Sequence, residues 1–463
     1  FAASEQGENN ETIMVQQNSN NLGNIHNADK HTLSSKNPIN SCEEVTSVKE
    51  TYVTVPKKES GSVSAKTNTE SSSFSGKEFA HEETEKIDLK SGFGYMGKPF
   101  QLLGKTESES EDCRSFFKGV KFSGDGSCIL SCGDDNILRV FETQGIVTQK
   151  GSKSKLFPRS VLQISEGECI YDYGWYPNSD SSDPVTCCFA SISKDHPVHL
   201  WDAYNGTLRA TYSPIDEKDE LARVISLCFN PFGNKIAAGG ESCMYIFDIS
   251  RPGTQTEYRK TVPTKKSKEG QRGLISCFAF KPDCSGVIAA GSYSKSICLY
   301  AENDSNRTIA ELTGHKGGVT NLLFTPNCNY LLSGSRKENE IFHWDIRMSI
   351  TPVNRYERRV ETNQRIYFDI DPSGKYMVTG STDGDARIYN ILTGALVATM
   401  PHQPDTVNGA AFHPRNRGTI LISTGQRHFK YCDDDNEGDN INSTALNSIQ
   451  MWTQLMDDRI EKV

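Results

Sequence analysis

The chain has 463 residues, a formal net charge of −9 at pH 7, 24% charged residues and 35% hydrophobic residues. This balance excludes a wholly basic nucleic-acid binder, although a basic patch on one face remains compatible with it, because local fields steer a partner. No run of about 18 apolar residues occurs, so no transmembrane helix is predicted. The opening residues, FAASEQGENN, lack the basic start and apolar core of a secretory signal, and the missing initiator Met is compatible with a fragment.

Residues 1–95 are predicted to form a disordered acidic tail. They are rich in Ser, Asn, Thr, Glu and Lys, and their few apolar residues show neither strand nor helix periodicity. Such a segment cannot bury enough apolar area to offset the ordering of its backbone, at roughly 1–2 kcal/mol per residue. The string GFGYMG (92–97) matches a dinucleotide-binding pattern, but no strand precedes it and no helix pattern follows. We interpret it as the flexible entry to a first strand, PFQLLG (99–104).

From about residue 115 the chain repeats one pattern. Each unit has a short apolar strand, a second strand rich in Ser, Gly and Ala, a tight turn that often carries an acid, and a third strand that ends in an aromatic residue. Three of the six spacings between these aromatics (46, 44 and 45) are close to the length of one WD-repeat blade, and the other three require loop insertions. The seven closing aromatics are Phe141, Trp201, Phe247, Tyr300, Trp344, Tyr389 and Trp452.

Seven such units predict an all-β, seven-bladed WD-repeat β-propeller over residues 96–463. A single four-stranded blade has two apolar faces and cannot stand alone, whereas blades in a ring cover one another. The ring must close, and we expect residues 99–104 to supply the outermost strand of the last blade, with the residues after Trp452 as the alternative. The last blade is expected to carry an acidic insertion at 432–447, which contains DDDNEGD (433–439).

Acidic side chains recur six residues before the closing aromatic in five units. A carboxylate there can cap the turn between the second and third strands by accepting backbone N–H bonds. In the fifth unit, His315 of a Gly-His pair is placed to bond this carboxylate, so we interpret it as structural. The residues assigned to these turns are Asp135, Asp195, Glu241, Glu338 and Asp383.

The loops before each first strand and the turns between second and third strands are expected to open on one rim of the ring. Arg and Lys there suit phosphate contacts, and Asn, Gln and Tyr suit base edges and stacking on unpaired RNA. An ordinary protein partner is an equally open alternative, and the acidic insertion would repel phosphate or dock a basic protein. The candidate rim residues are Lys118, Tyr171, Tyr173, Lys194, Arg272, Lys316, Arg336, Lys337, Asn363, Gln364, Arg365, Gln426 and Arg427.

Chemistry of other kinds finds little support in the sequence. No carboxylate pair, Ser-His-Asp set, Cys-His set or phosphate loop stands out above the acids that the turns require, so no enzyme and no cofactor are predicted. The ten His residues lack metal-ligand spacing, and the fourteen Cys residues form no C-x-x-C pair. We therefore expect reduced, buried thiols and an intracellular compartment. The lysines of PTKKSK (263–268) are interpreted as an inter-blade loop, with a nuclear import signal as the alternative.

The chain resembles one family, the telomerase Cajal body proteins, which are WD-repeat proteins of small Cajal body RNAs. The resemblance covers most of residues 115–430 and rests on strings such as ECIYDYGWYPN, LISCFAF, GHKGGVTNLLFTPN, SGSRKENEIFHWDIR and TNQRIYFDIDPSGKYMVTGSTDG. General WD repeats do not share IYDYGWY or TNQRIYFDIDPSG. The tail, the 432–447 insertion and the residues after Trp452 match nothing in the family pattern.

The resemblance implies a function. Family members bind a short element in the loop of H/ACA-type RNAs, including telomerase RNA, bring these RNAs to Cajal bodies and support telomerase assembly and telomere maintenance. It implies a nuclear, Cajal-body protein, with the cytoplasm as a further location, whose partners are these RNAs and the H/ACA and telomerase proteins, with no membrane or small-molecule substrate. The best candidate contacts become TNQR (Thr362–Arg365) and GQR (Gly425–Arg427). A protein-only scaffold or substrate-recognition subunit is the alternative.

Overall fold

The computed structural model describes residues 99–107, 115–143, 159–264, 267, 269–302, 304, 308–348, 351–427 and 447–454. The predicted tail (1–95), the string GFGYMG, nearly all of the acidic insertion and the residues after Gln454 lie outside this range. The boundary at residue 95 therefore stays a prediction. Within the described range, no helix is long and apolar enough to cross a membrane.

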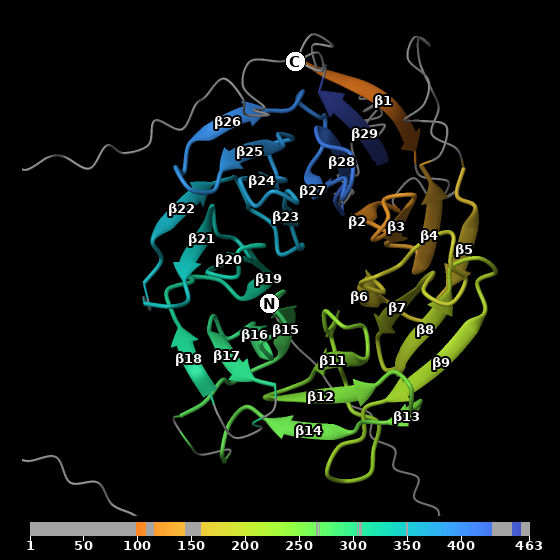
Figure 1. Cartoon of the computed structure of the whole chain (residues 1–463), viewed down its shortest axis with the longest axis vertical. Coiled ribbons are helices and arrows are strands. Elements are labelled where there is room, and N and C mark those ends of the chain that lie inside the picture. The colour runs from red at the N-terminus through yellow and green to blue at the C-terminus, as the bar shows by residue number, and fades with distance from the viewer. Residues whose placement is uncertain are drawn as a thin grey trace, which may run out of the picture. The chain divides into compact units, whose positions relative to one another are not determined.

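Seven antiparallel sheets stand around a ring, each with its first strand innermost (Figure 1). Blade 1 contains β2 (Phe117–Phe122), β3 (Cys128–Gly133), β4 (Ile137–Glu142) and β5 (Leu162–Ser165). Blade 2 contains β6 (Ile170–Trp175), β7 (Cys188–Ser193), β8 (Val198–Asp202) and β9 (Leu208–Ser213), to which β13 (Gly253–Thr254) adds in parallel. Blade 3 contains β10 (Ser226–Phe229), β11 (Lys235–Gly239), β12 (Cys243–Asp248) and β14 (Glu257–Lys260). Blade 4 contains β15 (Ile275–Phe280), β16 (Val287–Ser292), β17 (Ile297–Ala301) and β18 (Thr308–Leu312).

The remaining blades repeat this order. Blade 5 contains β19 (Val319–Phe324), β20 (Tyr330–Ser335), β21 (Glu340–Asp345) and β22 (Asn354–Glu357). Blade 6 contains β23 (Phe368–Ile370), β24 (Tyr376–Thr379), β25 (Arg387–Asn390) and β26 (Leu396–Thr399). Blade 7 contains β27 (Val407–Phe412), β28 (Thr419–Thr424), β29 (Ser448–Gln454) and, as its outermost strand, β1 (Phe100–Glu107). The predicted seven-bladed all-β propeller is confirmed.

The closing aromatics occupy one structural position in all blades. Each lies on the third strand and stands opposite an apolar residue of the second strand, as Phe141 does opposite Ile129 and Trp344 opposite Leu331. This pairing is the reason that the repeat is visible in the sequence: every blade needs a large side chain there to fill the space against the next sheet.

The ring closes through strand β1, as the sequence predicts. β1 runs antiparallel to β29, with Phe100 opposite Gln454 and Glu107 opposite Ser448. Leu103 packs with the apolar cluster that joins blade 7 to blade 1 through Phe117 and Met451. The last blade is thus assembled from both ends of the propeller, and residues Thr453 and Gln454 belong to β29 rather than to a rival closing strand.

Polar side chains also join each blade to the next. Every innermost strand places one side chain on the backbone of the following innermost strand, so the contact runs once around the ring. Because an unpaired polar group in a core is costly, these bonds fix the order and spacing of the blades as well as stabilising them. Five of these side chains donate to a backbone carbonyl: Lys121 to Tyr173 O, Ser226 to Ile275 O, Ser276 to Val319 O, Asn321 to Phe368 O and Asn408 to Phe117 O. The other two accept from a backbone N–H: Asp172 from Leu227 N and Asp369 from Phe412 N.

Candidate functional site

The rim is a composite surface built from loops and turns of several blades. We use "rim" for the loops before the first strands together with the turns between second and third strands. Backbone hydrogen bonds tie these segments together: Asp134 N donates to Phe116 O in blade 1 and Arg336 N to Gly318 O in blade 5, each at 2.9 Å. Gly425 N likewise donates to Thr406 O in blade 7. Contacts between blades, such as that of Arg427 in blade 7 with Asp134 in blade 1, place loops of different blades at one end of the ring.

In blades 1, 2, 6 and 7 the cations of the rim are matched by carboxylates. Arg427 lies 2.7 Å from Asp134, and Lys118 lies 3.4 Å from the same residue. Lys194 is flanked by Glu168 at 3.9 Å and by Asp195 at 3.6 Å. In blade 6, Arg387 contacts Asp383 and Asp385. These exposed pairs contribute little stability, but they leave little positive charge for a polyanion.

Blades 4 and 5 differ. Among the described residues, five cations stand on their part of the rim, and none of them has a described carboxylate partner. The guanidinium of Arg272 donates to the Ser267 carbonyl, and the acid nearest in sequence to Lys337, Glu338, is buried and bonded to His315. We call this group the basic sector; it comprises Arg272, Lys295, Lys316, Arg336 and Lys337.

Two arginine–tyrosine pairs stand on the rim. In the basic sector, the Arg336 guanidinium lies 3.9 Å from the centroid of the Tyr293 ring, and its Nη2 lies 2.5 Å from the phenol oxygen. Between blades 2 and 3, Arg223 lies 5.4 Å from the Tyr171 ring and 2.9 Å from its hydroxyl. The guanidinium is planar and weakly hydrated, so stacking on an aromatic ring holds it flat while leaving its charge intact.

Glycines let the neighbouring loop approach the first of these pairs. A Cβ on Gly317 would collide with the backbone oxygen of Arg336, and one on Gly318 would lie 2.9 Å from Tyr293 Cα. The string GHKGG therefore has two roles. His315 forms buried hydrogen bonds to Glu338 and Ser333 within blade 5, and Gly317 and Gly318 allow the loop to lie against the Arg336–Tyr293 pair.

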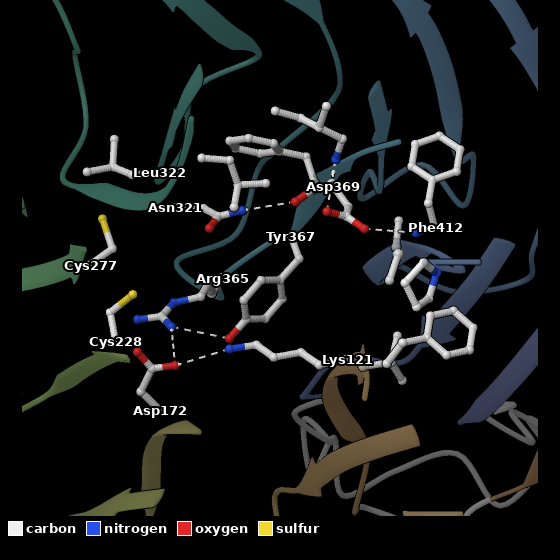
Figure 2. Close-up of a pocket in the computed structure, with 18 of the residues that line it drawn as sticks. Lys121, Asp172, Cys228, Cys277, Asn321, Leu322, Arg365, Tyr367, Asp369 and Phe412 are labelled. Carbon is white, nitrogen blue, oxygen red and sulfur yellow. Dashed lines mark hydrogen bonds and ion pairs between the residues drawn. The ribbon is translucent and has the colours of Figure 1, made fainter. Parts of the chain in front are cut away.

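The channel through the ring holds a second group of charges. A cavity of about 460 Å³ is lined by residues of all seven innermost strands. In Figure 2, Arg365 points into this cavity from the loop before β23 and meets Asp172 of blade 2. Its Nη1 lies 3.1 Å from Asp172 and 3.2 Å from the Tyr367 hydroxyl, and its Nη2 donates to Ser276 O of blade 4 at 3.0 Å. One side chain thus connects blades 6, 2 and 4.

This position differs from the one that the sequence suggests for Arg365. Its side chain is 15% exposed, and its partner Asp172 is 6% exposed. Burial by itself lowers the pKa of Arg365, but the neighbouring Tyr367 and Asp172 outweigh this and hold the pKa well above its usual value. Arg365 is therefore a permanently charged cross-brace of the channel.

Tyr173 is also internal rather than exposed at the rim. Its ring is 1% exposed and lies under the Lys121 ammonium at 4.9 Å. Burial raises the pKa of its hydroxyl well above the usual value. Because this side chain packs in the apolar cluster between blades 1 and 2, a base at the rim could not stack on it. Lys121, which sequence reasoning missed, is the cation that Tyr173 and Tyr367 share.

The strings TNQR and GQR, separated by about sixty residues, lie side by side. Gln364 Nε2 approaches Gly425 O at 3.4 Å. Asn363 is exposed, whereas Gln426 donates to Asp405 at 3.1 Å. These segments supply amide groups, but their two arginines are already engaged with aspartates.

The turn residues divide into two groups. In blade 5, His315 Nδ1 lies 2.5 Å from Glu338, and both His315 Nε2 and Trp344 Nε1 reach the Ser333 hydroxyl at 2.7 Å. This network is buried, and it ties the turn, the loop and the third strand together. In blades 1 and 6 the turn acid instead binds an arginine four residues later, Asp135 with Arg139 and Asp383 with Arg387.

Two turn acids do not cap their turns in this way. The Asp195 side chain is 62% exposed and contacts only Lys194 among the described residues, and Glu241 is exposed at the surface of blade 3. In blade 2, Glu166 takes over the bracing role, because it accepts from Ser191 and Ser193 and approaches His199, while Trp201 donates to Ser191 at 2.8 Å. Sequence reasoning missed Glu166, which stands just before the blade instead of in its turn.

The described cysteines and potential metal ligands form no reactive site. The eleven described cysteines are free, and burial raises the pKa of Cys132 and Cys277 to about 12, so both are neutral thiols. The described part of the chain contains no group of three or more His, Cys, Asp or Glu residues that could hold a metal ion.

Comparison with known proteins places the chain in a family. The model of the WD domain, G-beta repeat, matches residues 112–142, 306–345 and 364–390. The chain is 36% identical over 379 residues to human telomerase Cajal body protein 1, covering 78% of this chain and 68% of that protein. It is 38% identical to the mouse protein of that name (73% and 64%), and 29% identical to the telomerase Cajal body protein 1 homolog of Drosophila melanogaster (77% and 65%). The chain spans about two thirds of the length of these relatives. It belongs to the telomerase Cajal body protein 1 family.

Proposed function

We propose that this protein is an RNA-binding WD-repeat scaffold of the nucleus. In this proposal its rim binds H/ACA-type small Cajal body RNAs and telomerase RNA, directs them to Cajal bodies, and supports telomerase assembly and telomere maintenance together with H/ACA and telomerase proteins. The names of its relatives favour the Cajal body and telomerase. It acts by binding rather than by catalysis.

One observation carries the RNA assignment. On a chain of net charge −9, the described rim of blades 4 and 5 gathers five cations that no described carboxylate neutralises. Most rim cations of the other blades, such as Arg427 and Lys194, are paired with carboxylates, and Arg223 is the exception. Phosphate contacts dominate nucleic-acid affinity, and each contact releases counterions. An uncompensated basic sector beside an arginine–tyrosine stack is the combination expected of a surface for unpaired RNA.

A binding titration of the full chain tests this function. The ligand is an H/ACA loop RNA with and without the recognition element, measured at several salt concentrations. Replacing Lys316 and Lys337 by Glu should weaken binding and lower the slope of log K against log salt by about 0.7 for each lost phosphate contact. Lys194→Glu is the matched control, because Glu168 and Asp195 already neutralise that lysine.

The outcomes separate the alternatives. Equal losses for the control and the basic-sector variants would remove the assignment to blades 4 and 5. Absence of RNA binding by the unaltered chain, together with protein partners that stay bound after RNase treatment, would favour a protein-only scaffold instead.

A further inference from the structure

The left-handed residue of one turn differs in blades 4 and 5. In blades 1 to 6, one residue of the turn between second and third strands, five to seven residues before the closing aromatic, has a positive φ within the left-handed region. Blades 1, 2, 3 and 6 place Asn, Asp, Ser and Gly there, whereas blades 4 and 5 place Lys. The residues and their φ angles are Asn136 (61°), Asp195 (59°), Ser242 (56°), Lys295 (74°), Lys337 (50°) and Gly384 (85°).

Lysine is an unfavourable residue for this conformation. Gly has no Cβ to collide with the following carbonyl, and the short side chains of Asn and Asp can bond the local backbone, whereas Lys has neither property. Within the described residues, the ammonium groups of Lys295 and Lys337 have no hydrogen-bond or ion-pair partner that would compensate. A strained backbone conformation that no local side-chain contact stabilises is characteristic of functional sites.

The two strained lysines flank the Arg336–Tyr293 stack. Tyr293 lies two residues before Lys295 in the blade 4 turn, and Arg336 immediately precedes Lys337 in the blade 5 turn. Because Arg336 lies 3.9 Å from the Tyr293 ring, the two turns are in contact through this pair. Arg336 Nε is buried and has no hydrogen-bond partner in the described structure, so the guanidinium is held by its ring contact and by Nη2 alone.

We propose that the turns of blades 4 and 5 form a binding site for one unpaired nucleotide of RNA. The ammonium groups of Lys295 and Lys337 bind the phosphates on either side of it, and the guanidinium of Arg336, held flat by Tyr293, stacks on its base. A base stacks well on a guanidinium plane, and lysines act as point charges toward phosphate. This inference rests on the proposed function and deepens it, because it assigns the contact to one pair of turns.

The second arginine–tyrosine pair lacks this setting. Arg223 and Tyr171 stand beside the turns of blades 2 and 3, whose tips are Asp195 and Ser242. Asp195 is an anion and would repel a phosphate, so this pair is expected to contribute little. It therefore provides a matched control on the same protein.

The decisive variant is the double replacement Lys295→Asn and Lys337→Asn. Asn is favoured in the left-handed region, so the melting temperature should be equal to or higher than that of the unaltered chain. Binding to a short single-stranded RNA should nevertheless weaken at least about tenfold, and the slope of log K against log salt should fall by about 1.4. Because stability and affinity move in opposite directions, misfolding cannot explain the loss. Ser242→Asn, in the corresponding turn of blade 3, should leave the affinity for RNA and the slope unchanged.

Base stacking is tested with an abasic ligand. The unaltered chain should bind the RNA more tightly than an abasic oligonucleotide with the same number of phosphates. Arg336→Lys, which keeps the charge and loses the plane, should remove this preference while leaving affinity for the abasic ligand nearly unchanged, whereas Arg223→Lys should retain it. If the unaltered chain binds RNA and the lysine double variant binds equally well, the site is wrong and the proposed function stands. If the unaltered chain binds neither ligand, both fail.

Discussion

The replacement Arg365→Ala distinguishes a structural brace from an RNA contact. The side chain lies in the channel, where it bonds Asp172, Tyr367 and the Ser276 carbonyl. Removing one partner of a buried ion pair costs about 3–5 kcal/mol, because the other charge is left uncompensated. Asp172 keeps the backbone N–H groups of Tyr173 and Leu227 at 3.0 and 3.1 Å and the Lys121 ammonium at 3.8 Å, so we expect the lower end of this range, about 3 kcal/mol.

Urea unfolding followed by tryptophan fluorescence measures this loss of unfolding free energy. The double variant Arg365→Met with Asp172→Asn should lose less, since it removes both buried charges and leaves only the partly exposed Lys121 ammonium without its carboxylate. Lys194→Ala, an exposed cation with a 47% exposed side chain, should stay within about 0.5 kcal/mol of the unaltered chain. A variant at position 365 that keeps full stability and yet loses RNA binding would refute the brace and restore Arg365 as a direct contact.

Three further predictions concern stability. Burial lowers the pKa of His343 to about 4 in the folded chain. As the pH falls, this imidazole is therefore protonated in the unfolded chain before it is protonated in the folded chain. The free energy of unfolding should decrease by about 3 kcal/mol between pH 6.5 and 4. Thermal melts across this pH range should be flatter for His343→Phe, and equal slopes would contradict the assignment. Gly126→Ala should destabilise far more than Gly253→Ala in chemical denaturation, since both have positive φ but only the Gly126 Cβ would strike a side chain, that of His413. Deleting residues 99–107 should expose the edge of β29 and produce aggregation in light scattering, whereas a soluble monomer would argue against closure by β1.

Sequence alone determined the repeat and therefore the ring. The closing aromatics from Phe141 to Trp452 and the strand at 99–104 were readable because each blade satisfies its packing within one short stretch of chain. The network of His315 with Glu338 was visible for the same reason, since its members belong to one blade. The family likeness follows from these local patterns.

The tertiary structure alone decided which rim cations are free to meet a partner. Arg427 is neutralised by Asp134, which lies 293 residues earlier in the sequence but in the neighbouring blade. Arg365 is held in the channel by Asp172, which lies 193 residues earlier. The stack of Arg336 on Tyr293 likewise joins two blades. Charge compensation acts through space and is indifferent to sequence separation, so no local pattern could distinguish a solvated cation from a paired one. Closing the ring fixed those distances, and with them the part of the rim whose cations have no carboxylate partner among the described residues.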